Sequence, residues 1–334
     1  MNLCSFLTHS VYVLEMEMCV TTIAKSKIPE TNPLGYLLVN PDVQRAGVDP
    51  VVHKRNFGIS EGRQEFLESS ILEINNLRIH HKKSFIDEIL LPEMTIVQQS
   101  LFGDYQTEKY FSCDKTLPVV QSEVGLNSYD TELDIYFESH PNEWWLDMGA
   151  GLREKYRSNV IYTEISDLPT TDVICYGENL PFKNESFNGV VCLAVLEHVV
   201  NPQIVFDELV RVTKPGGRII IDWPFLQPYH GHPFHFYNAT SQGVQQLVRN
   251  NPDAELVDIS VPDWLHPIHT LQWIIRDWIS GIPKIAKDDF LELSLAEIAS
   301  CNPYELIQNT TFGNLSEESK SAIAAGHRVT VLKS

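Results

Sequence analysis

The feature that most constrains the fold is an alternation of apolar, strand-like runs with helical segments between residues 144 and 223. The run FNGVVCLAVL, at residues 187–196, is almost continuously apolar, which is typical of a parallel strand buried on both faces. Asn201 and Pro202 have the residue types of a helix N-cap and first position. The sequence KPGG ends this helix before the strand RIIIDW. This β-α-β order predicts an open α/β fold with a doubly wound, mainly parallel sheet.

Five further runs have the composition of strands. WWLDMG, NVIYTE and DVICY lie at residues 144–149, 159–164 and 172–176, and AELVDISV and HRVTVLK lie at residues 254–261 and 327–333. Together with the two strands described above they make seven. We therefore expect a seven-stranded, Rossmann-like sheet.

The chain divides into a weakly patterned first part and a regular second part. We expect residues 1–128 to form an N-terminal extension of unassigned role and residues 129–334 to form the sheet domain. Helices are predicted within residues 61–89, where apolar residues recur at helical spacings, and at residues 130–139. Residues 262–325 are too many for a simple connection between the last two strands, so we expect a helical lid there.

The composition narrows the partners and the compartment. The formal net charge is -19 and no basic stripe is present, which argues against a nucleic-acid partner. No apolar run approaches the roughly 20 residues that a membrane span needs, and the first residues lack the basic leader of a signal peptide. The six cysteines include no C-x-x-C pair, and Cys175 and Cys192 lie in apolar runs typical of buried thiols. We therefore expect a cytoplasmic protein without membrane contact.

Ligands of doubly wound sheets bind where the carboxyl ends of the strands meet. Gly149 and Gly151 end the first of these strands and let the backbone approach a ligand closely. Glu164 ends the next strand, where it is placed to receive both hydroxyls of a ribose. A dinucleotide site has a third glycine in front of a helix N-terminus, but residues 152–154 are Leu, Arg and Glu. The pattern therefore argues against a nicotinamide cofactor.

Five motifs, by their order and spacing, resemble one family. LDMGAG, the strand-end Glu164, GENLPF, VLEHVVNP and RVTKPGGRIII together resemble the class I S-adenosylmethionine-dependent methyltransferases, in particular the type 11 methyltransferase domains. The resemblance covers residues 146–223. It implies that residues 129–334 are a methyltransferase domain and that S-adenosylmethionine is the cofactor. An acidic pocket also suits the sulfonium cation of this cofactor better than it suits a pyrophosphate.

The resemblance also assigns residues to parts of the cofactor. The residues expected to hold it are Asp147, Gly149 and Gly151 along its amino-acid and ribose portions, Glu164 at the ribose hydroxyls, Gly177 and Glu178 beside the adenine, and Leu193 beside the methionine portion. Glu197 and His198 are placed at the rim of the same pocket. Tyr176 stands where the family often has an aspartate, and it is expected to border the adenine.

The loop at residues 222–240 carries three histidines close to the predicted pocket. Methyl transfer to an oxygen or nitrogen requires positioning and, for some acceptors, removal of a proton. We predict His232 and His235 as the catalytic pair, because imidazole titrates near neutrality. The alternative is a structural role, with the histidines bonded to backbone. No metal is expected, because this loop holds no carboxylate beyond Asp222.

These inferences predict methyl transfer from S-adenosylmethionine to a small-molecule acceptor, such as the hydroxyl of a sugar or secondary metabolite. One alternative is a non-catalytic protein that keeps the fold and serves as a binding partner or scaffold. It is motivated by Tyr176 and by the thirteen residues from Gly151 to Glu164, which allow a first crossover helix of barely two turns. A nucleotide-sugar or nicotinamide-dependent enzyme is a second alternative. The oligomeric state is not predicted.

Overall fold

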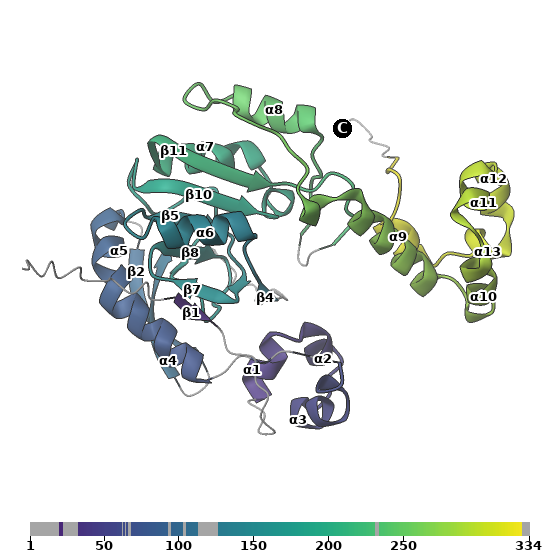
Figure 1. Ribbon diagram of the computed structural model, residues 1–334, viewed down its shortest axis with the longest axis horizontal. Helices are drawn as coiled ribbons and strands as arrows, with labels where there is room; N and C mark the ends of the chain where they lie inside the picture. The colour runs from purple at the N-terminus through teal and green to yellow at the C-terminus, as the bar shows by residue number, and fades with distance from the viewer. Residues whose placement is uncertain are drawn as a thin grey trace, which may run out of the picture.

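A computed structural model describes residues 20–22, 33–61, 63, 65, 68–92, 95–102, 105–112, 126–230 and 234–328. Its centre is a seven-stranded sheet in the order β11-β10-β5-β8-β9-β3-β2 (Figure 1). In that order the strands are Thr213–Asp222, Phe187–Leu193, Trp145–Met148, Val160–Glu164, Val173–Ile174, Tyr105–Ser112 and Thr95–Phe102. The predicted doubly wound, mainly parallel α/β sheet is confirmed.

The strand order places a ligand crevice at one point of the sheet. Strands β11 to β3 all run parallel, and only β2 is antiparallel to its neighbour β3. The five strands from β5 to β11 lie in the Rossmann order 3-2-1-4-5 when they are counted along the chain. The order reverses between β5 and β10, where Asp147 is in register with Val191. A ligand crevice is expected at the carboxyl ends of these two strands.

Two predicted helices cover the sheet beside this crevice. Helix α6 (Thr131–Ser139) begins at Asp130, whose side chain accepts hydrogen bonds from the first-turn backbone. Helix α7 (Pro202–Val212) begins at Asn201, as its capping residue and proline predict. Its buried face is formed by Val205, Phe206, Leu209 and Val212. Ile204 lies outside this buried face and is 45% exposed.

The predicted N-terminal extension contributes to the sheet itself. Strands β2 and β3 come from residues 95–112 and extend the sheet beyond β9. The predicted helical stretch is also present, as α4 (Glu68–Leu77), the π-helical turn η2 (Arg78–Lys82) and α5 (Lys83–Ile89). The sheet is therefore not confined to residues 129–334, where it was expected. The domain boundary between residues 128 and 129 stays a prediction.

The first crossover differs from its prediction. Residues 149–159 contain two short strands, β6 (Leu152–Arg153) and β7 (Lys155–Arg157), and no helix. The face of the sheet that a crossover helix would cover is instead covered by α4. Its side chains Ile71, Ile74 and Leu77 share a buried cluster with Tyr156 and Tyr162. The N-terminal part of the chain thus replaces the missing crossover helix.

A buried carboxylate joins this N-terminal helix to the sheet. Asp172 is fully buried and accepts hydrogen bonds from Arg78 Nε at 2.9 Å and from Lys82 Nζ at 2.8 Å. It also accepts from the Tyr156 hydroxyl and from the Tyr162 backbone N–H. The two cations hold the pKa of Asp172 below its usual range despite burial.

The C-terminal region departs most from the sequence prediction. Residues 254–261 form no strand, and Val257 and Val261 are 95% and 69% exposed. Thr213–Asp222 (β11) is therefore an edge strand of the described sheet, with a broad cleft along its free side. His327 and Arg328 are also outside any strand, and the rest of the strand predicted at residues 327–333 lies outside the described residues. A segment with the apolar composition of a strand forms one only where a neighbouring strand is available to pair with it.

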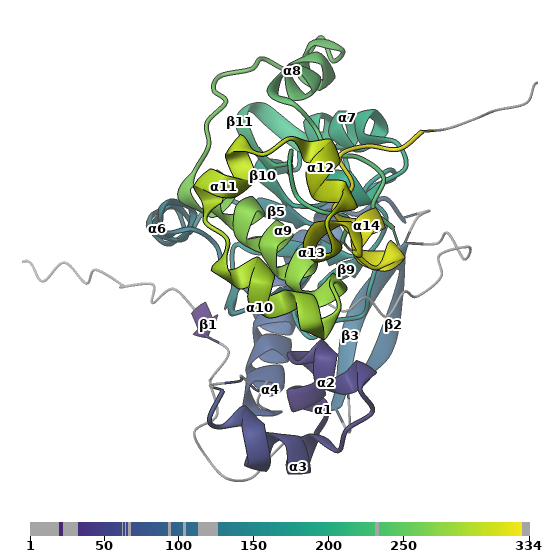
Figure 2. The same cartoon turned by 90° about the vertical axis from the view of Figure 1, so that its right-hand side faces the viewer.

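The segment predicted as a lid is helical, as expected. Its elements are η5 (Asp263–Leu265), α9 (Pro267–Gly281), α10 (Lys284–Glu292), α11 (Leu295–Ser300), α12 (Pro303–Gln308), α13 (Thr310–Gly313) and α14 (Glu317–Ala322). They enclose a small apolar cluster that includes Ile282, Phe290 and Phe312. Figures 1 and 2 show this unit extending from the side of the sheet toward which β10 and β11 point. It does not connect two strands of the described sheet.

The remaining elements are short. They comprise β1 (Val20–Thr22), which pairs with β7, β4 (Leu126–Asn127), which pairs with β6, and the helices α1 (Pro33–Leu38), α2 (Pro41–Arg45), α3 (Pro50–His53), η1 (Lys54–Gly58) and α8 (Ser241–Arg249). Cys175 and Cys192 are buried free thiols, as predicted. Within the described part of the chain, no helix has the length and apolar character needed to cross a membrane.

The Asp172 cluster yields a stability prediction. Asp172→Asn leaves Arg78 and Lys82 buried without a compensating charge, so we expect a loss of about 3–5 kcal/mol in the free energy of unfolding. Urea unfolding measures this loss. The control Glu317→Gln breaks an exposed ion pair with Lys320 and is expected to leave stability nearly unchanged. Similar small effects of both substitutions would contradict the structural importance of Asp172.

Candidate active site

The glycine turn after β5 lies very close to the loop after β10. Gly149 and Gly151 have φ values of 70° and 60°, in the left-handed region that favours glycine. A Cβ atom on Gly149 would lie 2.5 Å from Cγ2 of Val195, in the loop after β10. The turn therefore needs glycine at residue 149 for its backbone conformation and also for the space that Val195 occupies.

Glu164 closes this turn from the end of β8. Its Oε2 accepts a hydrogen bond from Gly151 N–H at 2.9 Å, and its Oε1 accepts one from Ile165 N–H at 2.8 Å. Burial raises the pKa of Glu164. A carboxylate has about four lone-pair sites, so each oxygen can accept a further hydrogen bond from a ligand hydroxyl. The structure thus places Glu164 at the end of β8, against the glycine turn, and its predicted contact with the ribose hydroxyls stays a prediction.

Asp147 has a different position from the one that the resemblance implied. It is fully buried, and its two oxygens accept from Arg153 Nε at 2.8 Å and Arg153 Nη2 at 3.1 Å. The Tyr129 hydroxyl also donates to it. Arg153 and Tyr129 thus hold the Asp147 carboxylate in the interior, beneath the glycine turn. Asp147 therefore supports the turn rather than facing a ligand.

The other predicted cofactor residues lie at the ends of the neighbouring strands. Gly177 is buried, and a Cβ atom on it would lie 3.0 Å from Met148 Sδ. Tyr176, Glu178 and Leu193 are partly exposed, with Leu193 the last residue of β10. The direct cofactor contacts of Gly177, Glu178 and Leu193 stay predictions.

Of the two histidines predicted to be catalytic, only His235 is among the described residues. His232 lies outside the described residues. His235 Nδ1 accepts a hydrogen bond from His230 N–H at 3.0 Å, and its Nε2–H donates to Asn238 Oδ1 at 2.9 Å. Both ring nitrogens of a neutral His235 are then occupied. This geometry favours the structural alternative, in which His235 holds the loop, over the role of a general base.

A buried glutamate that the sequence placed only at the rim is the most unusual group of the site. Glu197 lies in the short 3-10 turn η4 (Leu196–His198) after β10 and is 0% exposed. Neither carboxylate oxygen has a hydrogen-bond partner among the described residues. Burial raises the pKa of Glu197 to about 7. The motif VLEHVVNP marked this residue, but nothing in the sequence showed that its side chain turns inward.

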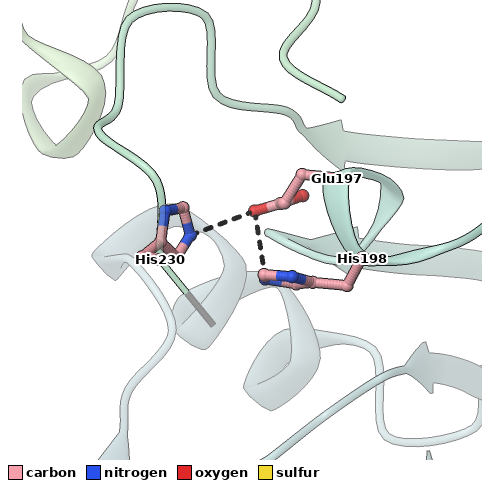
Figure 3. Close-up of side chains that lie close together, drawn as sticks. All are labelled: Glu197, His198 and His230. Carbon is pink, nitrogen blue, oxygen red and sulfur yellow. Dashed lines mark ion pairs between the residues drawn. The ribbon is translucent and has the colours of Figure 1, made fainter. Parts of the chain in front are cut away.

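Two histidines face this glutamate, as Figure 3 shows. The Nε2 atoms of His198 and His230 lie 3.7 Å and 3.9 Å from Glu197 Oε1. Their Nδ1–H groups donate to the carbonyls of Phe234 and Pro228, at 2.7 Å and 2.8 Å. Burial lowers the pKa of both imidazoles. The arrangement directs two Nε2 lone pairs at one buried carboxylate.

The end of β11 completes this edge of the sheet. Asp222 accepts a hydrogen bond from Trp264 Nε1 at 2.7 Å, and burial raises the pKa of Asp222. The ring centroid of His230 lies 5.1 Å from that of Trp273 on α9. The helical C-terminal unit therefore contacts both the strand end and the histidine loop.

The strand order, the glycine turn and the strand-end Glu164 agree with the resemblance to the class I S-adenosylmethionine-dependent methyltransferases. Residues 151–221 match the family model described as a methyltransferase domain. The match covers the strands β8 to β11 and η4, but it begins after Gly149. The resemblance predicted from the sequence is thus confirmed.

Curated relatives match over a similar part of the chain. A demethylmenaquinone methyltransferase of Paenarthrobacter aurescens is 31% identical over 100 residues, which are 29% of this chain and 40% of the relative. One of Streptomyces griseus is 33% identical over 92 residues, which are 26% of this chain and 40% of the relative. This chain therefore spans about two fifths of the length of these relatives.

A solved structure from Thermotoga maritima also matches. It is described as an S-adenosylmethionine-dependent methyltransferase and a possible histamine N-methyltransferase. The match has 18% identity and a TM-score of 0.27, and it covers 36% of this chain and 75% of that one. A TM-score this low carries no weight for function.

The glycine turn yields a second prediction. Gly149→Ala meets Val195 and also retains a positive φ, so we expect it to lose about 1–3 kcal/mol of stability through overpacking, beyond the backbone strain. Gly216→Ala is the matched control, because Gly216 has a φ of 78° and open space around its Cβ position. Val195→Ala in the Gly149→Ala background should restore part of the loss. Urea unfolding of the wild type, Gly149→Ala, Val195→Ala and the double variant measures the coupling, and additive effects would contradict the contact.

Proposed function

We propose that this chain is a methyltransferase that uses S-adenosylmethionine and acts on a small-molecule acceptor. The main observation behind the proposal is that Glu164 closes the glycine turn at residues 149–151. It lies at the carboxyl ends of β5 and β8, next to the point where the strand order reverses. The match of residues 151–221 to the methyltransferase domain supports the same chemistry.

The pocket chemistry favours a methyl donor over a dinucleotide. A dinucleotide pyrophosphate binds at the N-terminus of a helix that follows the glycine turn. Here the turn continues into β6 at Leu152, so no helix N-terminus points at the site from residues 149–159. The carboxylate of Glu164 beside the turn suits a cationic sulfonium cofactor better than a phosphate. This argues against a nicotinamide or nucleotide-sugar enzyme.

We propose the chemical class of the methyl acceptor rather than a particular molecule. Two curated relatives are named demethylmenaquinone methyltransferases, and we take from them a small-molecule acceptor but not its identity. Our proposal is a hydroxyl acceptor, such as that of a sugar or secondary metabolite. The net charge of -19 disfavours a nucleic-acid acceptor. His232 stays a predicted proton acceptor, whereas the hydrogen bonds of His235 favour a positioning role.

A non-catalytic protein is the remaining alternative from another class. It is motivated by Tyr176 and by the shortened first crossover. In the structure, α4 fills the place of the crossover helix, and Glu164 still closes the glycine turn. The short crossover is therefore compatible with a formed cofactor site, which favours the enzyme over the scaffold.

Calorimetric titration with S-adenosylmethionine and S-adenosylhomocysteine tests the proposal. We expect both ligands to bind, and we expect Glu164→Ala to weaken binding by about 1–3 kcal/mol because ribose hydroxyls and the Gly151 N–H lose their acceptor. The control Glu292→Ala removes an exposed carboxylate on α10 and should bind like the wild type. A folded wild-type protein that binds neither ligand would establish the non-catalytic alternative.

The raised pKa of Glu164 gives a pH prediction for the same titration. Ribose hydroxyls donate to the ionised carboxylate, and burial makes Glu164 take up a proton at a higher pH than an ordinary glutamate. The affinity for S-adenosylhomocysteine should therefore fall as the pH is lowered through this raised pKa. Glu164→Gln carries no titratable group and should bind weakly without this acidic limb. An identical acidic limb in Glu164→Gln would assign the pH dependence to another group.

A further inference from the structure

The buried side chain of Glu197 makes no hydrogen bond with the described residues and has the imidazoles of His198 and His230 within ion-pair distance. It is 0% exposed, and both of its oxygens lack a hydrogen-bond partner in the part of the chain that the structure describes. A buried carboxylate without a partner is costly, because it has lost its hydration without compensation. Buried charges in proteins are paired or coordinate metals.

The Nδ1–H group of each histidine makes a hydrogen bond that leaves its Nε2 atom available as a metal ligand. His198 Nδ1–H donates to the Phe234 carbonyl, and His230 Nδ1–H donates to the Pro228 carbonyl. These bonds fix the tautomer and leave each Nε2 with a free lone pair on the Glu197 side (Figure 3). Histidines that bind metals almost always donate their other ring N–H to a carbonyl, a carboxylate or water in this way.

The distances among the three side chains fit a metal ion. Their ligand atoms all lie within 4.8 Å of one another, and the two Nε2 atoms are 3.7 Å and 3.9 Å from Glu197 Oε1. Ligand atoms around a tetrahedral Zn²⁺ are about 3.3–3.5 Å apart, as follows from its bond lengths. The two distances to Glu197 Oε1 exceed this spacing by a few tenths of an ångström, and the two imidazoles would approach each other by at most about 1.5 Å on binding. We propose that Glu197, His198 and His230 bind a divalent first-row transition-metal ion such as Zn²⁺.

The surrounding backbone holds the three ligands together. Glu197 and His198 are consecutive in η4, and the Glu197 carbonyl accepts hydrogen bonds from Phe236 N–H and Tyr237 N–H at 2.7 Å and 3.3 Å. These bonds join the histidine loop to η4. His235 is a positioning residue here, because its Nδ1 accepts from the backbone N–H of His230. The sequence led us to expect no metal because the loop lacks a suitable carboxylate, and Glu197 supplies that carboxylate from η4.

The donor set also indicates the kind of ion. Two imidazoles and one carboxylate suit borderline ions such as Zn²⁺ better than Ca²⁺ or Mg²⁺, which prefer oxygen ligands. Three protein ligands leave at least one coordination position for water or a substrate oxygen. Such an open position is typical of catalytic rather than structural sites.

The position of the site suggests its use, and this step rests on the proposed function. Val195, two residues before Glu197, packs against Gly149 of the turn. An acceptor hydroxyl bound to the ion would lie near the methyl donor with a lowered pKa. It releases its proton to water, and its oxygen forms a bond to the methyl carbon. The carbon–sulfur bond breaks at the same time, and its electron pair stays on sulfur.

Metal titration of the full chain tests the site without any methyl donor. Protein treated with a chelator and then dialysed is titrated with Zn²⁺ by calorimetry and with Co²⁺ by visible absorption. We expect one ion per chain, with Co²⁺ bands of nitrogen and oxygen ligation and no thiolate charge-transfer band. His198→Ala/His230→Ala and Glu197→Gln should each lower the affinity at least about tenfold.

The matched control is His80→Ala/His81→Ala, which also removes two histidines but from an exposed turn far along the chain. It should bind the ion like the wild type. Equal affinity in the wild type and in folded His198→Ala/His230→Ala, or no stoichiometric binding by the wild type, would overturn the proposal. Circular dichroism checks that each variant is folded. If a variant is unfolded, the Co²⁺ spectrum of the wild type tests the proposal, because bands of nitrogen and oxygen ligation support the site and their absence overturns it.

The metal site and the proposed function can fail separately. Binding of S-adenosylhomocysteine by metal-free protein supports the cofactor site whatever the metal titration shows. Binding of Zn²⁺ without any affinity for S-adenosylhomocysteine would support the metal site and reject the methyltransferase proposal.

Discussion

The buried carboxylate of Asp172 is the interaction on which the rest of the structure depends. It accepts hydrogen bonds from Arg78 and Lys82 of the N-terminal helical segment and from Tyr156 of the first crossover. The face of β8 has no crossover helix of its own, so these contacts fix α4 over it. Because removing one member of a buried ion cluster leaves uncompensated charge, the N-terminal segment and the sheet are coupled.

That coupling positions the two parts of the candidate site. With β8 covered, Glu164 is held at its end and closes the turn at Gly151. On the other side of β5, the loop after β10 packs Val195 against Gly149 and turns Glu197 into the interior. The proposed cofactor pocket and the proposed metal site therefore share one edge of the sheet and one loop contact.

Local patterns predicted much of the fold correctly. The apolar runs at β5, β8, β9, β10 and β11 were recognised, because parallel strands buried on both faces have a distinctive composition. The N-cap Asn201 was recognised because capping uses only neighbouring residues. The strands β2 and β3 were missed, and residues 254–261 were wrongly predicted as a strand. Whether an alternating run becomes a strand depends on a partner that is distant in the sequence.

The sequence by itself determined the class of fold, the glycine turn and the strand-end Glu164, because each depends on short-range geometry and chain order. Only the tertiary structure decided which residues cover the first crossover and where the polar side chains point. It directed Asp147 to Arg153 and brought His230 to Glu197 across two loops. These outcomes depend on long-range packing and on the cost of leaving a buried charge without a partner, and neither is visible in a local pattern of residues.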